Sequence, residues 1–495
     1  MSNKFLSSMS NAGYTANGAA TNLSSSNACV DLFFQIGSMR AASIEDLCVA
    51  WTKAFIQDAD IALKTLFWSR DVRSGAGERR SFRVIMRHMA ERQPELLTER
   101  LIALIPQFGR WDDLLVFFNT DCEIFALKAI GNALRSEDSL CAKWMPREKS
   151  SKYLIARKIR EHMEYSPKQY RKMLSSLSSV VETKMCADQW TEIEFSHVPS
   201  QAMRIYKHAF EKHAPQAWNE YTDALSSGAS KVNAGAIHPH EILAPYITPS
   251  SNSSYNSYSD AYESVVCEIP KVTEAQWDAL PNWLEGNTSR ILPIVDTSGS
   301  MGGIYSTLSK IRPIDVSVSL GLYIAERNSG PFKDYFVTFS ENPMMHYIKG
   351  KDLSSRLASV CSSEWGGSTN IEGTFSAILH HAKTSGAALE DMPNVILILS
   401  DMEFDICSNA NETAMQSIRL QYEAAGFELP KIVFWNLNAR PENVPVRFDE
   451  VGTALVSGFS PAIMKSLLSD TENFTPEAIM RSTVCSELYA EVCYE

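Results

Sequence analysis

Five oxygen-bearing side chains in the second half of the sequence have the types that a hard divalent metal ion prefers. Three follow the apolar run 291–295, one follows the apolar run 395–399, and one lies in a Gly-rich turn between the two runs. Short apolar runs are typical of buried parallel strands, and open α/β sheets bind ligands beyond the carboxyl ends of such strands. Carboxylate and hydroxyl oxygens suit Mg²⁺ or Mn²⁺. The sequence therefore predicts an Mg²⁺ (or Mn²⁺) site made by Asp296, Ser298, Ser300, Thr369 and Asp401.

Each of these loops also has an ordinary structural interpretation. An Asp or Ser in such a place can cap a helix or form a turn. Within the turn that begins with Gly366 and Gly367, Ser368 is an alternative to Thr369 as the hydroxyl ligand. The presence of all three loops, in this order and within one α/β pattern, favours the metal site over separate caps.

The other parts of a catalytic site do not stand out in the sequence. The histidines have no recognised catalytic spacing, and the adjacent His380 and His381 point to different faces of a predicted helix. The Gly-rich turns lack the Lys of a phosphate-binding loop, and no general base is evident. We therefore predict that the protein is not an enzyme, with hydrolysis at the metal as the remaining alternative.

From about Arg290 onward the sequence alternates between strand and helix patterns. This alternation predicts a doubly wound α/β domain, a parallel sheet with helices on both faces. The predicted strands are 291–295, 335–339, 395–399, 432–435 and 454–456. The predicted helices are 314–326, 369–383, 413–425 and 461–468.

The first half of the sequence is helical in pattern. Between about Asp31 and Asp223, apolar residues recur three and four positions apart, as in segment 43–68, and Gly or Pro breaks the pattern at short intervals. Short helices joined by tight turns predict an α-helical repeat domain, a HEAT-like solenoid or ring. No fixed repeat period is visible, so the repeats are degenerate.

These patterns divide the chain into five segments. They are a polar N-terminal segment over 1–30, the α-helical repeat domain over 31–225, a Ser/Asn-rich linker or loop over 226–287, the α/β domain over 288–470 and a C-terminal extension over 471–495.

The charge of the chain is distributed unevenly. Residues 1–250 hold 30 Lys and Arg against 27 Asp and Glu, whereas residues 251–495 hold 16 against 31. Segment 143–184 is the most basic, with 11 basic and 4 acidic residues and interleaved tyrosines. Such a surface suits single-stranded or structured RNA, and the alternative is a solvated helix face. The predicted RNA contacts here are Lys149, Lys152, Arg157, Lys158, Arg160, Lys168, Arg171 and Lys172.

A second group of cations surrounds the Gly-rich turn 74–77. Arginines around the exposed amides of a helix N-terminus form an anion site. In the alternative interpretation, Gly75 and Gly77 only form an inter-helix turn, and Asp71 and Glu78 pair with the arginines. The predicted RNA contacts here are Arg70, Arg73, Arg79 and Arg80.

Composition limits where such a protein can work. The 10 cysteines are scattered as singles without a CxxC pair, which argues against a zinc site and for free thiols in a reducing compartment. No apolar stretch approaches the roughly 20 residues of a membrane span, and the N-terminus lacks the pattern of a signal peptide. We expect a cytoplasmic protein without a membrane partner.

The metal-site residues resemble the metal-ion-dependent adhesion site of the von Willebrand factor A domain. That family has Asp-x-Ser-x-Ser after its first strand, a Thr in a later loop and an Asp after the central strand, which correspond here to residues 296–300, Thr369 and Asp401. The resemblance covers about residues 288–470. It implies that Ser298, Ser300 and Thr369 are direct ligands, that the aspartates act through water, and that a partner's carboxylate completes the shell.

Helical repeats followed by such a domain resemble the Ro autoantigen (TROVE) family. Segments 15–19, 28–34, 70–80, 109–114 and 232–241 are similar to an uncharacterised Ro-like family of plants, phages and large viruses. The resemblance implies a scaffold that binds small non-coding RNA through its helical repeats, without DNA specificity. The alternative is a protein–protein interaction module that binds an acidic partner at the metal and has no RNA role, since the acidic second half would repel nucleic acid.

Overall fold

A computed structural model describes most of the chain. The described residues are 11–178, 180–249, 264–266, 268–302, 311–339, 343–363, 365, 368–409, 412–469 and 473–494. Gly366 and Gly367 of the predicted Gly-rich turn, and residues 250–263 of the predicted linker, lie outside this set.

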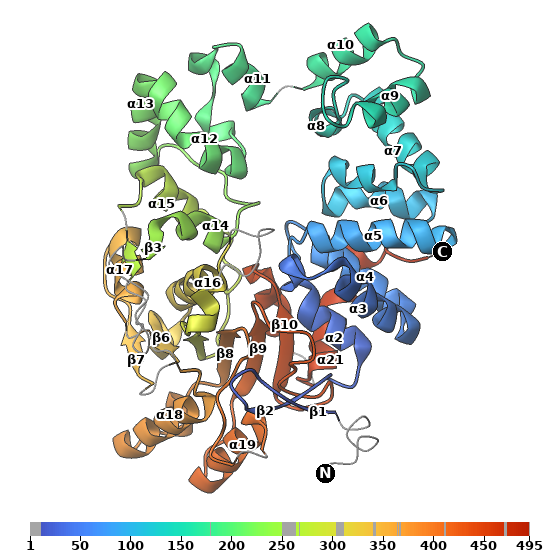
Figure 1. The fold of residues 1–495 in the computed structure, drawn as a ribbon. Coiled ribbons are helices and arrows are strands. Elements are labelled where there is room, and N and C mark those ends of the chain that lie inside the picture. Colours follow the sequence, from blue (N-terminus) through green and yellow to red (C-terminus); the bar gives the residue numbers. More distant parts are fainter. Residues whose placement is uncertain are drawn as a thin grey trace.

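The helices of the first half form an arch whose two ends rest on the α/β domain (Figure 1). The first limb contains α2 (Ala28–Ile36), α3 (Ile44–Gln57), α4 (Ala59–Arg70), α5 (Arg80–Arg92), α6 (Glu99–Phe108), η3 (Trp111–Phe117), α7 (Glu123–Arg135), α8 (Ser139–Trp144), α9 (Tyr153–His162) and α10 (Pro167–Leu177). The second limb contains α11 (Val181–Cys186), α12 (Ser200–His213), α13 (Pro215–Ser226), α14 (Pro239–Leu243) and α15 (Lys271–Asp278). The predicted helical domain is confirmed.

Side-chain caps set where these helices begin and end. Asp58 ends α3 and caps α4, because its carboxylate accepts a hydrogen bond from Ile61 N at 3.1 Å. The helical segment predicted over 43–68 is therefore two helices. Ser43 caps the first of them through the N–H of Asp46, at 3.0 Å.

The described residues of the α/β domain form a six-stranded sheet with the order β10-β9-β8-β5-β6-β7. Its strands are β5 (Ile291–Val295), β6 (Tyr335–Thr338), β7 (Met345–Tyr347), β8 (Val395–Ser400), β9 (Lys431–Asn436) and β10 (Thr453–Ser457). Neighbours run parallel except β7, which is antiparallel to β6. The strand order reverses between β5 and β8, which is the topological switch point where doubly wound sheets bind ligands. The predicted α/β class is confirmed.

Among the described residues, five α-helices lie between the strands or directly after the last one, before α21. They are α16 (Pro313–Arg327), α17 (Leu353–Cys361), α18 (Ile371–Ser385), α19 (Ala414–Ala425) and α20 (Met464–Leu467). Every residue of β5 and β8 is buried, as expected for central strands covered on both faces. The short edge strand β7 was missed by the sequence prediction, because its three residues are half-buried or exposed and do not form an apolar run.

The first helix of the arch packs directly against the sheet. Ser457 Oγ donates to the carbonyl of Phe33 at 2.6 Å, and Asn436 Nδ2 donates to the carbonyl of Phe34 at 2.7 Å. The backbones of Gly37 and Gly458 approach so closely that a Cβ on Gly37 would lie 2.6 Å from Gly458 N. The two halves therefore share one hydrophobic core.

Both ends of the described chain belong to this junction. A hairpin of β1 (Ala12–Tyr14) and β2 (Ala20–Asn22) lies along the α/β domain, and α21 (Pro476–Val484) packs against α2, α4 and β10. The segments predicted as a polar N-terminus and a C-terminal extension thus fasten the arch to the sheet.

The segment 226–287, predicted as a linker or loop, contains regular structure in its described parts. Besides α14 and α15 it holds the paired strands β3 (Ile247–Pro249) and β4 (Ser264–Val266). The helix α14 contacts α16, and Trp277 Nε1 of α15 donates to Glu326 at 2.6 Å. These short elements were not predicted, because the segment is rich in Ser and Asn. Contacts with the α/β domain hold them in place.

Candidate functional site

The loops after β5 and β8 emerge side by side at the switch point of the sheet. The two strands pair in parallel from Ile291 with Val395 onward, and the N–H of Asp296 continues the ladder by donating to the carbonyl of Leu399 at 3.0 Å. The structure thereby brings Asp296 and Asp401 to the same edge of the sheet, where ligands of such folds bind.

The first loop is ordered by hydrogen bonds to Asp296, which is fully buried. The N–H of Ser298 donates to Asp296 Oδ1 at 2.9 Å, and the hydroxyl of Ser400 donates to Asp296 Oδ2. The hydroxyl oxygens of Ser298 and Ser300 are 3.1 Å apart. Two of the predicted hydroxyl ligands therefore lie together in the same loop as the carboxylate.

The hydroxyl groups of Ser368 and Thr369, the two candidate ligands of the second loop, differ in their hydrogen bonding. Ser368 Oγ and Thr369 N both donate to Asp405 Oδ2, each at 2.7 Å. The hydroxyl of Thr369 is completely buried and has no hydrogen-bond partner among the described residues. Because a buried hydroxyl without a partner is unfavourable, Thr369 Oγ1 is the oxygen that a bound metal ion would satisfy.

Asp296 and Asp401 are buried carboxylates without an ion-pair partner in the described part of the chain. Burial and the nearby charge of Asp296 raise the pKa of Asp401 to about 7, and a hydrogen bond from Ser300 opposes part of this rise. Burial also raises the pKa of Asp296. Two adjacent buried carboxylates repel each other, and a divalent cation between them would remove the repulsion.

The donor set therefore fits a hard divalent ion. Among the described residues no group of three or more His, Cys, Asp and Glu side chains is placed to hold a metal, so binding here would depend on hydroxyls as well as carboxylates. The residues that would hold Mg²⁺ are Asp296, Ser298, Ser300, Thr369 and Asp401. Such an ion would supply a positive charge at this edge of the sheet.

A strap formed by the β1–β2 hairpin fixes the loop that follows β8. The hydroxyl of Thr15 donates to the carbonyl of Phe404 at 2.7 Å. Asn17 Nδ2 donates to the carbonyl of Glu403 at 2.7 Å and to Asp405 Oδ1 at 3.0 Å. Asp405 thus joins the strap to the loop of Thr369. The contact between Asn17 and Asp405 was not predictable from the sequence, because no local pattern connects positions 388 residues apart.

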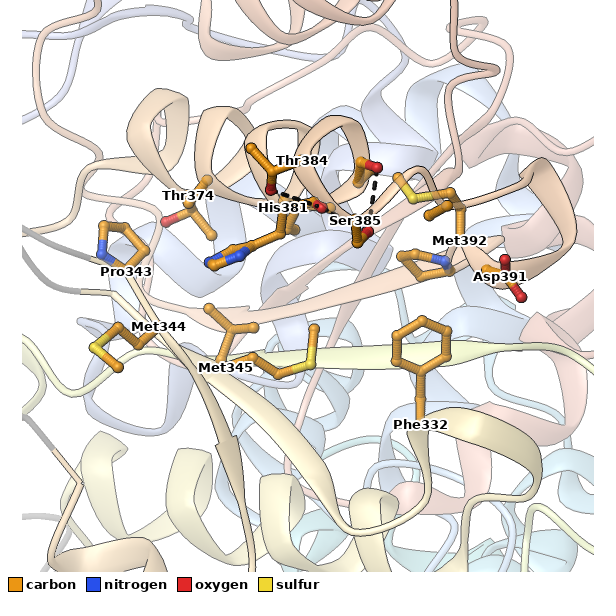
Figure 2. A pocket seen from close by; sticks show the side chains of 16 residues that line it. Phe332, Pro343, Met344, Met345, Thr374, His381, Thr384, Ser385, Asp391 and Met392 are labelled. Atoms are coloured by element: carbon orange, nitrogen blue, oxygen red, sulfur yellow. Dashed lines mark hydrogen bonds between the residues drawn. The ribbon is translucent and has the colours of Figure 1, made fainter.

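A cavity of about 480 Å³ lies away from the metal loops, between α18 and the strands β6 and β7. In Figure 2, Phe332, Met344 and Met345 lie on one side of it, and Thr374 and His381 of α18 lie on the other. None of the predicted metal or RNA residues lines this cavity.

Some of the arginines predicted to contact RNA instead form an internal ion-pair network. Asp113 is fully buried and accepts hydrogen bonds from Arg70 Nε at 2.8 Å and from Arg83 Nε at 2.6 Å. We call Arg70, Arg83, Arg110, Asp112 and Asp113 the arginine hub. Arg70 is only 2% exposed, so its predicted role is corrected to an internal one that connects α4 to η3.

The turn between α4 and α5 is occupied by its own hydrogen bonds. The N–H groups of residues 76–78 donate to carbonyls of residues 68–71, and the buried carboxylate of Glu78 pairs with Arg40. The amides of residues 76–78 are therefore used within the turn. The pairing of Asp71 and Glu78 with the arginines of the turn, as the structural interpretation had it, is not found among the described residues, because Asp71 accepts from the N–H groups of Arg73 and Ser74 and Glu78 pairs with Arg40.

The other arginines near this turn differ in exposure. Arg80 is half-buried and donates to the carbonyl of Ala42 at 2.8 Å. Arg73 is exposed and donates to the carbonyl of Gln107 at 3.1 Å. Arg79 is exposed and forms no ion pair within the described ranges. Arg73 and Arg79 are thus the members of this group that face solvent.

The eight cations predicted between residues 149 and 172 fall into two groups. Three form ion pairs with glutamates at 2.7–2.8 Å: Arg157, Lys158 and Arg160. Five are exposed and have no acidic partner in the described parts of the chain: Lys149, Lys152, Lys168, Arg171 and Lys172. We call these five the crown cations, because α9 and α10 lie in the part of the arch that is far from the sheet (Figure 1).

Family models match both halves of the chain. The model described as "Domain of unknown function (DUF2828)" matches residues 15–121 and 117–288, which is more than half of the sequence. The chain belongs to this family. A second model, "Domain of unknown function (DUF7788)", matches residues 290–488, the α/β half of this DUF2828 member.

A relative from a large virus aligns with nearly the whole chain. An uncharacterized protein of Acanthamoeba polyphaga mimivirus is 28% identical over 525 residues, covering 95% of this chain and 87% of the viral protein. The predicted resemblance to an uncharacterised family with members in large viruses is thereby confirmed.

The chain also aligns with the crystal structure of Deinococcus radiodurans RO (RSR) protein. The TM-score is 0.40 at 14% identity, over 92% of this chain and 93% of the other.

Among the described helices, none combines the length and apolar character needed to span a bilayer.

Proposed function

We propose that this protein is a non-enzymatic scaffold with two binding sites. Its helical arch binds structured or single-stranded RNA, in particular a small non-coding RNA. Its α/β domain binds a carboxylate-bearing partner at an Mg²⁺ or Mn²⁺ ion. One observation carries the proposal: each half holds charges that the described residues do not neutralise, the crown cations in the arch and the carboxylates of Asp296 and Asp401 in the sheet domain.

The support for the metal is the state of its predicted ligands. Thr369 offers a buried hydroxyl that no described group satisfies, and Asp401 has its pKa raised to about 7 by burial and by the charge of Asp296. Both conditions are unfavourable for the protein alone and are relieved by a divalent cation. A metal with an open position accepts a carboxylate oxygen from a partner.

The support for RNA is the exposure of the crown. Next to the exposed cations, the side chains of Tyr153 and Leu154 at the start of α9 are 54% and 57% exposed. Cations that track a phosphate backbone, together with an aromatic ring on which a base stacks, are the usual elements of single-stranded RNA sites. The ion-paired Arg157, Lys158 and Arg160 would contribute less, because their charge is already compensated.

The RNA site is tested by the salt dependence of binding. A labelled stem-loop and a labelled single-stranded RNA are titrated with the full-length protein between 50 and 200 mM salt. Replacing Lys168, Arg171 and Lys172 together with Ala should lower the slope of log K against log salt by about 2, because each contact contributes about 0.7. As a matched control, Arg157→Ala removes one paired charge and should change the slope less than Arg171→Ala does. The absence of any RNA shift at 50 mM salt would refute the RNA role.

The protein-interaction alternative is favoured by one observation, the excess of 15 acidic over basic residues in 251–495. If purified protein carries no nucleic acid and binds no RNA, but captures an acidic protein in Mg²⁺ and releases it in EDTA, this alternative holds. Capture that is unchanged by Asp296→Ala would show that the partner does not use the metal site.

A further inference from the structure

The predicted metal site borders a cavity of about 410 Å³ at the boundary between the two halves of the molecule. Ser300 and Asp401 line it from the sheet domain, and Met39, Ala41 and Ala42, just after α2, line it from the arch. A volume of this size lies within the range of small-molecule sites, about 300–1,000 Å³. A ligand in this cavity would touch the metal loops and the helical half at once.

The walls of the cavity differ in polarity. Met39, Ala41 and Ala42 from the arch and Ala439 and Pro441 from the loop after β9 are apolar. Beside Asp401, the polar end holds the pair of Glu403 and Arg440, whose side chains form two hydrogen bonds at 2.6 and 3.0 Å. The cavity thus combines an apolar body with one charged end, which suits an amphipathic ligand.

The charges at the polar end of the cavity limit the charge that such a ligand can carry. Asp401 and Glu403 line the cavity, and Asp296 and Asp405 lie behind them, so four carboxylates face one positive charge on Arg440. Their net charge is about −3 when all are ionised, and a divalent ion reduces it to about −1. A singly charged anion therefore meets less repulsion here than a phosphate monoester, which carries about two negative charges.

We propose that this cavity is a metal-dependent site for a small monocarboxylate with an apolar body. The carboxylate faces the metal and Arg440, and the apolar body lies against Met39, Ala41 and Ala42. The inference rests on the metal site of the proposed function and adds the class of ligand. It also assigns the ligand to the boundary of the two halves, so that binding would hold them together.

The test starts with the metal alone. Mg²⁺ and Mn²⁺ are titrated into the full-length, metal-free protein by calorimetry. Absence of binding refutes the metal site of the proposed function, and the inference fails with it. If metal binds, the loaded protein is titrated with acetate, hexanoate, 4-phenylbutyrate and, as an uncharged match, hexanol. Each buried methylene is worth about fourfold in affinity, so we expect hexanoate or 4-phenylbutyrate to bind at least tenfold more tightly than acetate or hexanol, and not in EDTA.

Variants locate the binding. Ala42→Trp and Ala439→Phe fill the cavity from the arch and from the loop after β9, and should reduce affinity for the longer carboxylates at least tenfold while leaving the metal affinity unchanged. The control Ala377→Trp places similar bulk in the cavity beside α18 and should change neither affinity. Retained metal binding shows that the variants are folded. With metal bound, failure of both long carboxylates to exceed acetate, binding in EDTA, or indifference to both filling variants would overturn the inference and leave the metal site standing.

Discussion

The arginine hub and the predicted metal site both bury aspartates, but they treat the charge in opposite ways. In the hub, the fully buried Asp113 is held by Arg70 and Arg83. After β5 and β8, Asp296 and Asp401 are equally buried and accept only hydrogen bonds from neutral groups within the described residues.

The difference separates buried aspartates that hold the fold together from buried aspartates that are available to bind a ligand. A buried carboxylate with cationic partners connects helices and needs no ligand, whereas one without such partners is stable only if a proton or a metal ion supplies the positive charge. We therefore expect that removing the negative charge of a buried aspartate lowers the free energy of unfolding in the arginine hub and raises it in the metal-free loops after β5 and β8.

The largest effect is expected at the hub. Asp113→Ala leaves Arg70 buried without its partner, so the free energy of unfolding should fall by about 3–5 kcal/mol, as for other broken buried pairs. Asp112→Ala is the control, because the Asp112 carboxylate is 13% exposed and water can replace part of its interactions. The measurement is denaturant unfolding. An equal loss in both variants would contradict the distinction between buried and partly exposed pairs.

The next effect is the stabilisation by metal. Mg²⁺ at about 100 times its dissociation constant should raise the free energy of unfolding by about 2.7 kcal/mol. Thr369→Val should lose most of this gain without loss of stability in EDTA, because the Thr369 hydroxyl has no described hydrogen bond to lose. Thr374→Val is the matched control. Its buried hydroxyl donates to the carbonyl of Asn370 at 2.9 Å, so it should lose about 1 kcal/mol in EDTA but keep the metal gain.

An effect of opposite sign is expected at Asp401 in metal-free protein. Its folded-state pKa of about 7 lies above the ordinary 3.8, so its ionisation on raising the pH through this interval disfavours the folded state. Asp401→Asn should therefore raise stability at pH 8 in EDTA, by up to about 4 kcal/mol for the full shift, with little effect at pH 4. Thermal unfolding at the two pH values measures it. If the variant loses stability at pH 8, Asp401 resembles Asp113 and the comparison fails.

The smallest effect concerns the strap. Asn17→Ala removes two hydrogen bonds to the loop after β8 and should weaken Mn²⁺ binding about two- to fivefold, since one hydrogen bond is worth about 0.5–1.5 kcal/mol. Asn22→Ala is the control in the same hairpin, because Asn22 donates to the carbonyls of Val444 and Pro445 instead. Equal Mn²⁺ affinities of the two variants would show that the strap does not support the metal site.

Much of the α/β half could be predicted because its signals are local. The apolar runs of β5 and β8 and the oxygen-bearing residues after them lie next to each other in the sequence, and the parallel order brings the ends of both strands to one edge. The choice between Ser368 and Thr369 was not predictable. It depends on Asp405, which is 37 residues from Ser368 and binds the Ser368 hydroxyl.

In the helical half, the exposure of individual arginines was even less predictable from the sequence. Arg70, Arg73, Arg79 and Arg80 occur together in the sequence, yet one is buried in an ion pair, one is half-buried and two face solvent. Composition counts their charges equally. Exposure depends on which helix packs against each side chain, and the partner of Arg70 is 43 residues away.

The class of both halves, the family of the chain and the edge of the sheet where a metal would bind follow from sequence alone, because periodicity and strand-end motifs are properties of neighbouring residues. Three features became visible only in the folded chain: which hydroxyl is unsatisfied, which cations are uncompensated, and that the metal loops border a cavity shared with the arch. These features arise from contacts between segments up to about 400 residues apart, such as α2 with β10, and burial and charge compensation are set by such contacts.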